Sequence, residues 1–84
     1  MEFTGKLFCA GQVMLPEVRG KITSAVPSAH IQVRQTGFFL LPAGASIPLD
    51  QYEIKLDTGE MFRIFIDADF TAQANPIPVP FDVV

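Results

Sequence analysis

Two side chains of this sequence have the chemistry of a nucleophile and a base: Cys9, the single cysteine, and His30, the single histidine. A thiolate beside an imidazole is a reactive pair, and it also requires a third side chain that orients the imidazole. The sequence indicates no such Asn or Asp, and Cys9 falls among the apolar positions of an expected strand. We therefore predict that Cys9 is a buried structural thiol.

Other patterns that carry chemistry do not occur in the sequence. It has neither the G-x-S-x-G nor the S-x-x-K pattern of serine nucleophiles, and it has no glycine-rich phosphate-binding loop. One cysteine and one histidine are too few for a structural zinc site, which takes four such ligands. Asp67 and Asp69 form a D-x-D pair without the further spaced ligands of a calcium loop, so we interpret them as solvated charges. We expect no metal site and no cofactor.

The tripeptide Asp57-Thr58-Gly59, which follows the run Ile54–Leu56, resembles the hydrophobic-D-T-G signature of aspartic proteases. In that family two such loops share a proton between their carboxylates. Proteases of the retroviral type also need a flap hairpin and a second apolar segment with glycine after this loop, and only 25 residues follow Gly59 here. A three-residue hairpin turn explains the same tripeptide, so we predict a turn and no enzyme.

A third pattern combines cations with aromatic rings, as on the strand faces with which small barrels bind single-stranded nucleic acid. Its members are Lys6, Phe8, Arg19, Lys21, Arg34 and Phe38. Residues 1–42 hold four Lys/Arg and two Asp/Glu, whereas residues 43–84 hold two and seven. The whole chain has a net charge of −3 and a pI near 4.8, which disfavours nucleic acid as the partner. We keep this face as the alternative function.

The elements that position these residues are strands, and the hairpin Gln51–Asp67 is the clearest. If Leu56 opposes Glu60 across the turn, the apolar side chains of the two strands gather on one face, which we take as the core face. That face holds Tyr52, Ile54, Phe62, Ile64 and Ile66. On the outer face the same register places Met61 opposite Lys55, Phe65 opposite Gln51, and Glu53 opposite Arg63 as an expected ion pair.

Alternation of apolar and polar residues predicts the other strands. They run over residues 2–9, 18–24 and about 30–41. Gly37 lies inside the third of them and indicates a bulge, a bend or a close approach of backbones. Gly11 and Pro16 indicate a loop before the second strand, residues 42–48 a long loop, and residues 68–75 one helical turn.

The C-terminal residues alternate proline with apolar side chains, in the order Pro76, Ile77, Pro78, Val79, Pro80 and Phe81. Successive residues of a strand direct their backbone groups to opposite edges, so the prolines remove the donors from one edge only. We expect a strand that pairs on one side and blocks further pairing, either in its own sheet or added to a neighbour's.

These elements predict an all-β protein with little or no helix: a small antiparallel barrel of five to six strands, SH3-like or OB-like. We assign residues 1–75 to the barrel and residues 76–84 to the C-terminal edge strand or tail. The chain has 84 residues, of which 49% are hydrophobic and 18% charged, which suits one folded domain. No apolar run approaches the roughly 20 residues of a membrane helix, and no secretory signal begins the sequence, so we expect a cytoplasmic protein.

The expected function is that of a non-catalytic protein-interaction module, which associates with itself as a homo-oligomer or binds a larger protein. Eight phenylalanines exceed what so small a barrel is expected to hide, and an apolar surplus on the surface indicates a partner. The residues expected to bind this partner are Met61, Phe65, Ile77, Val79 and Phe81.

Overall fold

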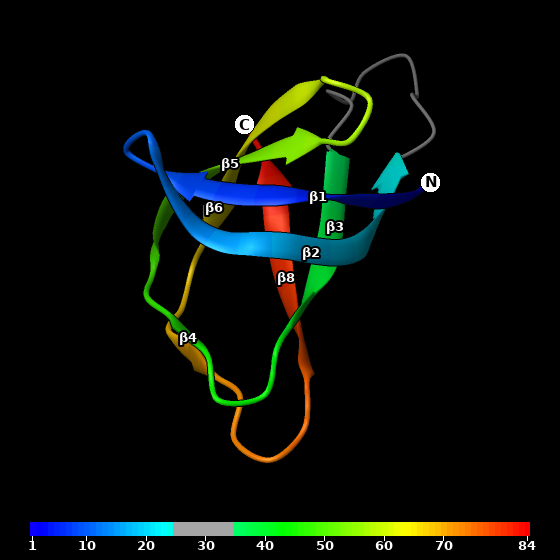
Figure 1. Ribbon diagram of the computed structural model, residues 1–84. Coiled ribbons are helices and arrows are strands. Elements are labelled where there is room, and N and C mark those ends of the chain that lie inside the picture. Colours follow the sequence, from blue (N-terminus) through cyan, green and yellow to red (C-terminus); the bar gives the residue numbers. More distant parts are fainter. Residues whose placement is uncertain (25–34) are drawn as a thin grey trace.

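The computed structural model describes residues 1–24 and 35–84, and these form a closed six-stranded antiparallel barrel (Figure 1). Its strands are β1 (Glu2–Cys9), β2 (Gln12–Ser24), β3 (Gln35–Leu41), β5 (Asp50–Leu56), β6 (Met61–Ile66) and β8 (Ile77–Val83). They follow one another around the barrel in the order β1-β2-β3-β8-β6-β5, with β5 pairing back to β1. The described residues contain no helix, so the predicted fold class is confirmed.

The β5–β6 hairpin has the predicted register, with Tyr52 opposite Ile64 and Ile54 opposite Phe62. Gly59 adopts a φ of 97°, and its N–H donates to the carbonyl of Leu56 at 2.9 Å, as a glycine-bearing hairpin turn requires. The core face is buried as expected, apart from Phe62, which is half-buried. Glu53 and Arg63 lie opposite each other, but within the described residues the one ion pair joins Arg19 to Glu17 instead.

The expected strand over residues 2–9 is confirmed as β1, whereas the expected loop before the second strand is wrong. β2 begins at Gln12 and continues through Pro16. Its pairing with β1 is interrupted by two bulges, one on each side of Leu15. At each bulge β2 has one residue more than β1. Proline is tolerated in a strand at such a bulge, because the bulge already interrupts the ladder.

Residues 30–34 of the expected third strand, His30 and Arg34 among them, lie outside the described residues. From Gln35 onward the expected strand is present as β3, and Phe39 and Leu41 are fully buried. Gly37 marks a close backbone approach, because a Cβ there would lie 2.5 Å from the carbonyl oxygen of Lys21 in β2, and also 2.7 Å from the ring of Phe81.

The C-terminal residues form β8, which lies between β3 and β6 and completes the barrel. Along the proline stretch β8 pairs with β3 alone, and β6 joins it only from Asp82 onward, so pairing on one side is confirmed for that stretch. β8 is not an edge strand, however, because its last residues have partners on both sides. Residues 76–84 are therefore part of the barrel.

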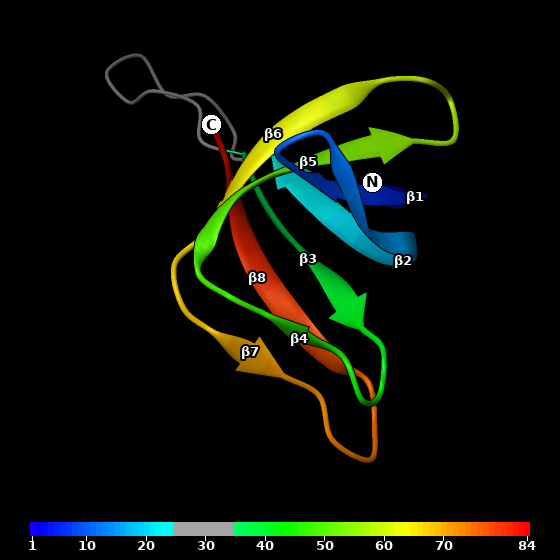
Figure 2. The ribbon, with the colours of Figure 1, turned by 60° about the vertical axis from the view of Figure 1, so that its left-hand side comes forward.

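Two short strands, β4 (Ser46–Ile47) and β7 (Phe70–Thr71), pair at one end of the barrel (Figure 2). The helical turn expected over residues 68–75 is therefore wrong. Ile47 and Ala72 are buried there, and the N–H of Ala72 donates to the carbonyl of Ala45 at 2.9 Å. The described residues contain no helix that is long and apolar enough to cross a membrane.

The core fills the interior along the whole barrel. Its buried apolar side chains are Phe3, Leu7, Val18, Ile22, Phe39, Leu41, Ile47, Tyr52, Ile54, Leu56, Ile64, Ile66, Ala72, Val79 and Phe81.

Candidate functional site

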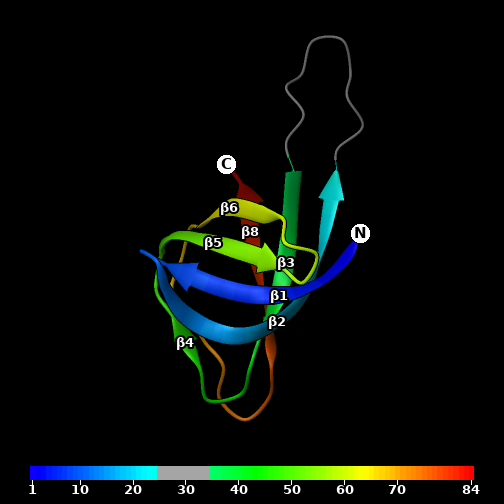
Figure 3. The same ribbon diagram turned by 45° about the horizontal axis from the view of Figure 1, so that its top comes forward.

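Large apolar side chains gather on the outer face of β3 and β8. Because Phe39 and Leu41 point into the barrel, Phe38 and Leu40 point outward, and they are 38% and 43% exposed. β3 and β8 run side by side (Figure 3), which places Phe38 opposite Pro80 and Leu40 opposite Pro78. Both prolines are exposed. We call these four side chains the apolar block.

A groove of about 500 Å³ runs beside the apolar block across the outer face of β1, β2 and β3. Phe38 and Leu40 form its apolar wall, and Arg19 and Lys21 contribute cations from β2. On the far side, Thr4 lies opposite Arg19 and Glu2 lies opposite Lys21. We call this the cationic groove. It has the chemistry to accept an apolar side chain together with a carboxylate.

Arg19 is weakly engaged within the chain. Its nearest guanidinium nitrogen lies 3.9 Å from Oε1 of Glu17, and both side chains are 73% exposed. An exposed pair of this kind contributes at most about 1 kcal/mol, so the guanidinium can turn to an incoming carboxylate at little cost.

A second hollow, of about 260 Å³, lies on the other side of the apolar block. Its lining includes Pro80 of the block, the half-buried ring of Phe65, and the carboxylates of Asp67 and Asp82. Phe65 and Asp82 are direct neighbours in the β6–β8 ladder. We call this the acidic hollow. It contrasts in charge with the cationic groove.

The residues expected to bind a partner do not come together on one surface. Met61 is 53% exposed and lies in a separate shallow hollow with Phe8, Glu53 and Lys55. Phe65 borders the acidic hollow.

For the three apolar residues of β8, the expectation of an outward binding surface needs correction. Val79 is fully buried, Phe81 is 4% exposed, and Ile77 is half-buried against the core. The ring of Phe81 packs on Phe39 and Phe3, with centroid distances of 6.2 and 6.4 Å. Their apolar surface is thus covered by the barrel itself.

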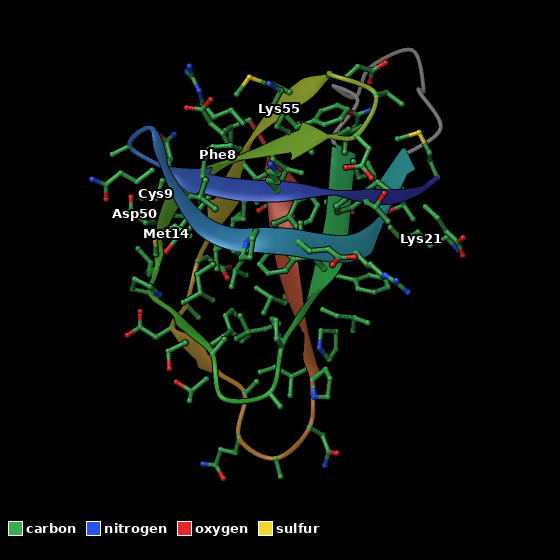
Figure 4. All side chains as sticks on the ribbon, viewed as in Figure 1. Phe8, Cys9, Met14, Lys21, Asp50 and Lys55 are labelled. Atoms are coloured by element: carbon green, nitrogen blue, oxygen red, sulfur yellow. The ribbon has the colours of Figure 1, made fainter. Side chains whose placement is uncertain are left out.

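Of the alternative nucleic-acid residues, Arg19, Lys21 and Phe38 line the cationic groove. Lys6 and Phe8 lie on the outer face of β1, and Arg34 is outside the described residues. Figure 4 shows Phe8 well apart from Lys21. The structure therefore joins three of the six residues in one site, and Glu2 places a carboxylate among them.

Four residues of the site are not predicted from the sequence as binding residues: Leu40, Pro78, Pro80 and Asp82. The sequence contains one signal for Leu40, because Phe38 and Leu40 alternate with Phe39 and Leu41 in an expected strand. The position of β8 beside β3, which completes the apolar block, has no local signal.

Cys9, which the sequence predicts to be buried, is only half-buried. Its Sγ lies 3.9 Å from Oδ2 of Asp50 and 3.8 Å from the carbonyl oxygen of Gln51 (Figure 4). Partial burial, and then the adjacent Asp50 carboxylate, raise the pKa of the Cys9 thiol. A thiol whose pKa is raised is a poor nucleophile.

Asp57 of the D-T-G tripeptide holds the hairpin turn against β1. Its N–H donates to the carbonyl of Thr4 at 3.1 Å, and the Thr4 hydroxyl donates to its carboxylate. This is a structural role for Asp57. Among the described residues, no three His, Cys, Asp or Glu side chains are grouped so as to hold a metal ion.

Tyr52, the single tyrosine, is expected to ionise only in strongly alkaline solution. Its ring is 1% exposed, and its hydroxyl donates to the carbonyl of Pro48 at 2.6 Å. Burial, followed by the nearby Cys9 and Asp50, raises the pKa of Tyr52 from 10.0 to about 12. Between these pH values the unfolded chain loses this proton first, so the free energy of unfolding falls as the pH rises.

An absorbance titration of Tyr52, run on the folded protein and in denaturant, measures both pKa values. Ionisation of the folded protein at the same pH as the denatured chain would contradict this placement of the hydroxyl.

The comparisons with known proteins leave the site to be interpreted from its own geometry. Matched against protein-family models, curated proteins and solved structures, the chain gives no match in any of the three.

Proposed function

We propose that this protein is a non-catalytic protein-interaction module that binds its partner through the apolar block and the cationic groove. The observation that carries the proposal is the exposure of Phe38 and Leu40 on a barrel that is already closed. Neither side chain is needed to fill the interior, since Phe39 and Leu41 of the same strand do so. Clustered apolar side chains on the surface of a small domain are typical of interaction sites.

The composition of the site supports a protein partner. Aromatic rings and arginines are the side chains that contribute most to protein interfaces, and here Phe38 and Arg19 line one groove. The prolines at positions 78 and 80 offer rigid apolar surface, because a fixed ring loses little conformational freedom on binding. A partner that inserts an apolar side chain beside Phe38 and a carboxylate beside Lys21 satisfies both parts of the site.

The double variant Phe38→Ser/Leu40→Ser is expected to lose partner binding at least tenfold while it keeps its fold, since both positions are exposed. The wild type and the variant serve as immobilised baits, and retained proteins are quantified by mass spectrometry. Met61→Ser is the matched control, because Met61 is even more exposed than Phe38 and Leu40 but lies outside the site. Equal retention by all three baits would contradict the proposal.

A single-stranded nucleic acid is the second candidate partner, because the groove combines Phe38 with two cations. Against it stand Glu2 and Glu17, which lie beside Lys21 and Arg19 respectively. Titration of a labelled oligonucleotide at rising salt decides between the two. Affinity that falls steeply with salt and is lost in the double variant favours nucleic acid, and no measurable binding at low salt excludes it.

A further inference from the structure

The apolar block has flanks of opposite charge. Around the barrel the strands follow in the order β2, β3, β8 and β6. On the β2 side the cationic groove is lined by two cations, Arg19 and Lys21, and by one carboxylate, Glu2. Toward β6, Asp82 and Asp67 line the acidic hollow, and no Lys or Arg of the described residues is in its lining. The lining is therefore net positive on one side of the apolar block and negative on the other.

A surface with this order is complementary to itself. A twofold axis along the seam between β3 and β8 turns the block of one copy onto the block of another. The same rotation brings the β2 flank of each copy over the β8–β6 flank of its partner. Lys21 then approaches the acidic hollow that contains Asp82, and the contact occurs twice because a twofold interface uses the same patch on both copies. A partner whose surface carried only one sign of charge would be attracted to one flank and repelled by the other.

We propose that a second copy of this chain covers the apolar block, in a face-to-face dimer with twofold symmetry about the β3–β8 seam. This inference rests on the proposed function, since it names the partner of the same surface. The two hollows widen the contact: the block together with its flanks involves five neighbouring strands, in the order β1, β2, β3, β8 and β6. A stable interface needs about 800 Å² from each partner, more than the block alone is expected to supply.

Among the described strands of the barrel, pairing of strand edges between two copies is disfavoured, which favours contact through a face of the barrel. The barrel is closed, and β8 presents prolines along the stretch where β6 does not pair with it. β2 pairs with β3 only from Gly20 onward, and its earlier part carries Pro16 and two bulges. Prolines and bulges are the features that keep strand edges from pairing with another chain.

Charge reversal on the two flanks tests the dimer. Lys21→Glu gives a chain with carboxylates on both flanks, and Asp82→Lys gives one with cations on both flanks. Each variant alone is expected to dimerise at least tenfold more weakly than the wild type in sedimentation equilibrium, because like charges then face each other across the twofold axis. An equimolar mixture of the two variants is expected to recover dimers of wild-type affinity, since opposite charges meet again.

Lys55→Glu is the matched control: it reverses a lysine that lines neither hollow of the proposed surface and is expected to dimerise as the wild type does. Thermal unfolding checks the fold of every variant. Asp82 is half-buried, so Asp67→Lys, at an exposed carboxylate of the same hollow, replaces Asp82→Lys if the latter unfolds.

A wild type that stays monomeric at millimolar concentration overturns the dimer, and so does a dimer that Lys21→Glu leaves unchanged. Either result leaves the proposed function standing if the Phe38→Ser/Leu40→Ser bait still loses a protein that the wild type retains. If that bait retains everything that the wild type does and the wild type is monomeric, both proposals fail.

Discussion

Deletion of residues 76–84 is expected to leave the chain unable to fold. These residues contain β8, whose removal leaves β3 without a partner on one side and opens the barrel between β3 and β6. Val79 and Phe81, which are almost fully buried, leave with it. Truncating one buried phenylalanine to alanine costs about 3–5 kcal/mol, and a whole domain is stable by only about 5–15 kcal/mol.

Circular dichroism and urea unfolding of the truncated and full-length chains measure this effect. The matched control removes Val84 alone, which is 62% exposed and follows the end of β8. Phe81→Ala is a milder variant, expected to lose about 3–5 kcal/mol of unfolding free energy and to remain measurable by urea titration. A truncated chain that unfolds cooperatively near the full-length midpoint would show that β8 is dispensable, contrary to its place in the core.

The parts of the fold that the sequence predicts are those with local causes. The register of β5 and β6 follows from a three-residue turn with Gly59 in a left-handed conformation, and this turn sets every cross-strand pair of the hairpin. β1 follows from an alternation that is strict over the first six of its eight residues. The prolines of β8 likewise predict which of its edges stays unpaired, because each lacks an N–H.

The errors concern interactions between residues far apart in the chain. Pro16 reads as a loop residue, but pairing with β1 continues past it because bulges absorb the extra residues. The strand β7 has only two residues, too few for an alternation of apolar and polar side chains to be recognised. It forms because β4 lies beside it and pairs with it. The sequence predicts that Phe81 binds a partner, yet a strand inserted between β3 and β6 has one face toward the interior, and Phe81 lies on that face.

The candidate site divides in the same way. The ring of Phe38 and the cations Arg19 and Lys21 can be recognised in the sequence directly. The alternation of β3 places Leu40 on the same face as Phe38. The contrast between the two flanks depends on the order β2, β3, β8 and β6, which joins residues about sixty positions apart. No local pattern contains that order, because it follows from how the barrel closes.

Gly20→Ala is expected to destabilise the barrel by about 3 kcal/mol or more. Gly20 lies in β2 between Phe3 of β1 and Phe39 of β3, with which it is paired on either side. A Cβ at this position would overlap the carbonyl oxygen of Phe38 and lie 2.8 Å from the Cα of Phe39 and 2.9 Å from the Phe3 ring. Two of the three neighbours are backbone atoms of a paired strand, so they cannot move aside as a flexible side chain would.

The matched control is Gly11→Ala, which makes the same chemical change where an added Cβ meets nothing within 4 Å. Gly11 has a φ of 80°, so alanine there costs only the conformational penalty, roughly 1–2 kcal/mol. Urea unfolding of both variants separates the two effects, because the excess loss in Gly20→Ala measures the steric overlap. If the two variants lose the same free energy of unfolding, β2 and β3 have room to separate at Gly20. Their close approach at this residue is then not required for the stability of the barrel. If the excess is as large as expected, the absence of a side chain at Gly20 is what lets β1, β2 and β3 approach closely enough to form the cationic groove on their outer face.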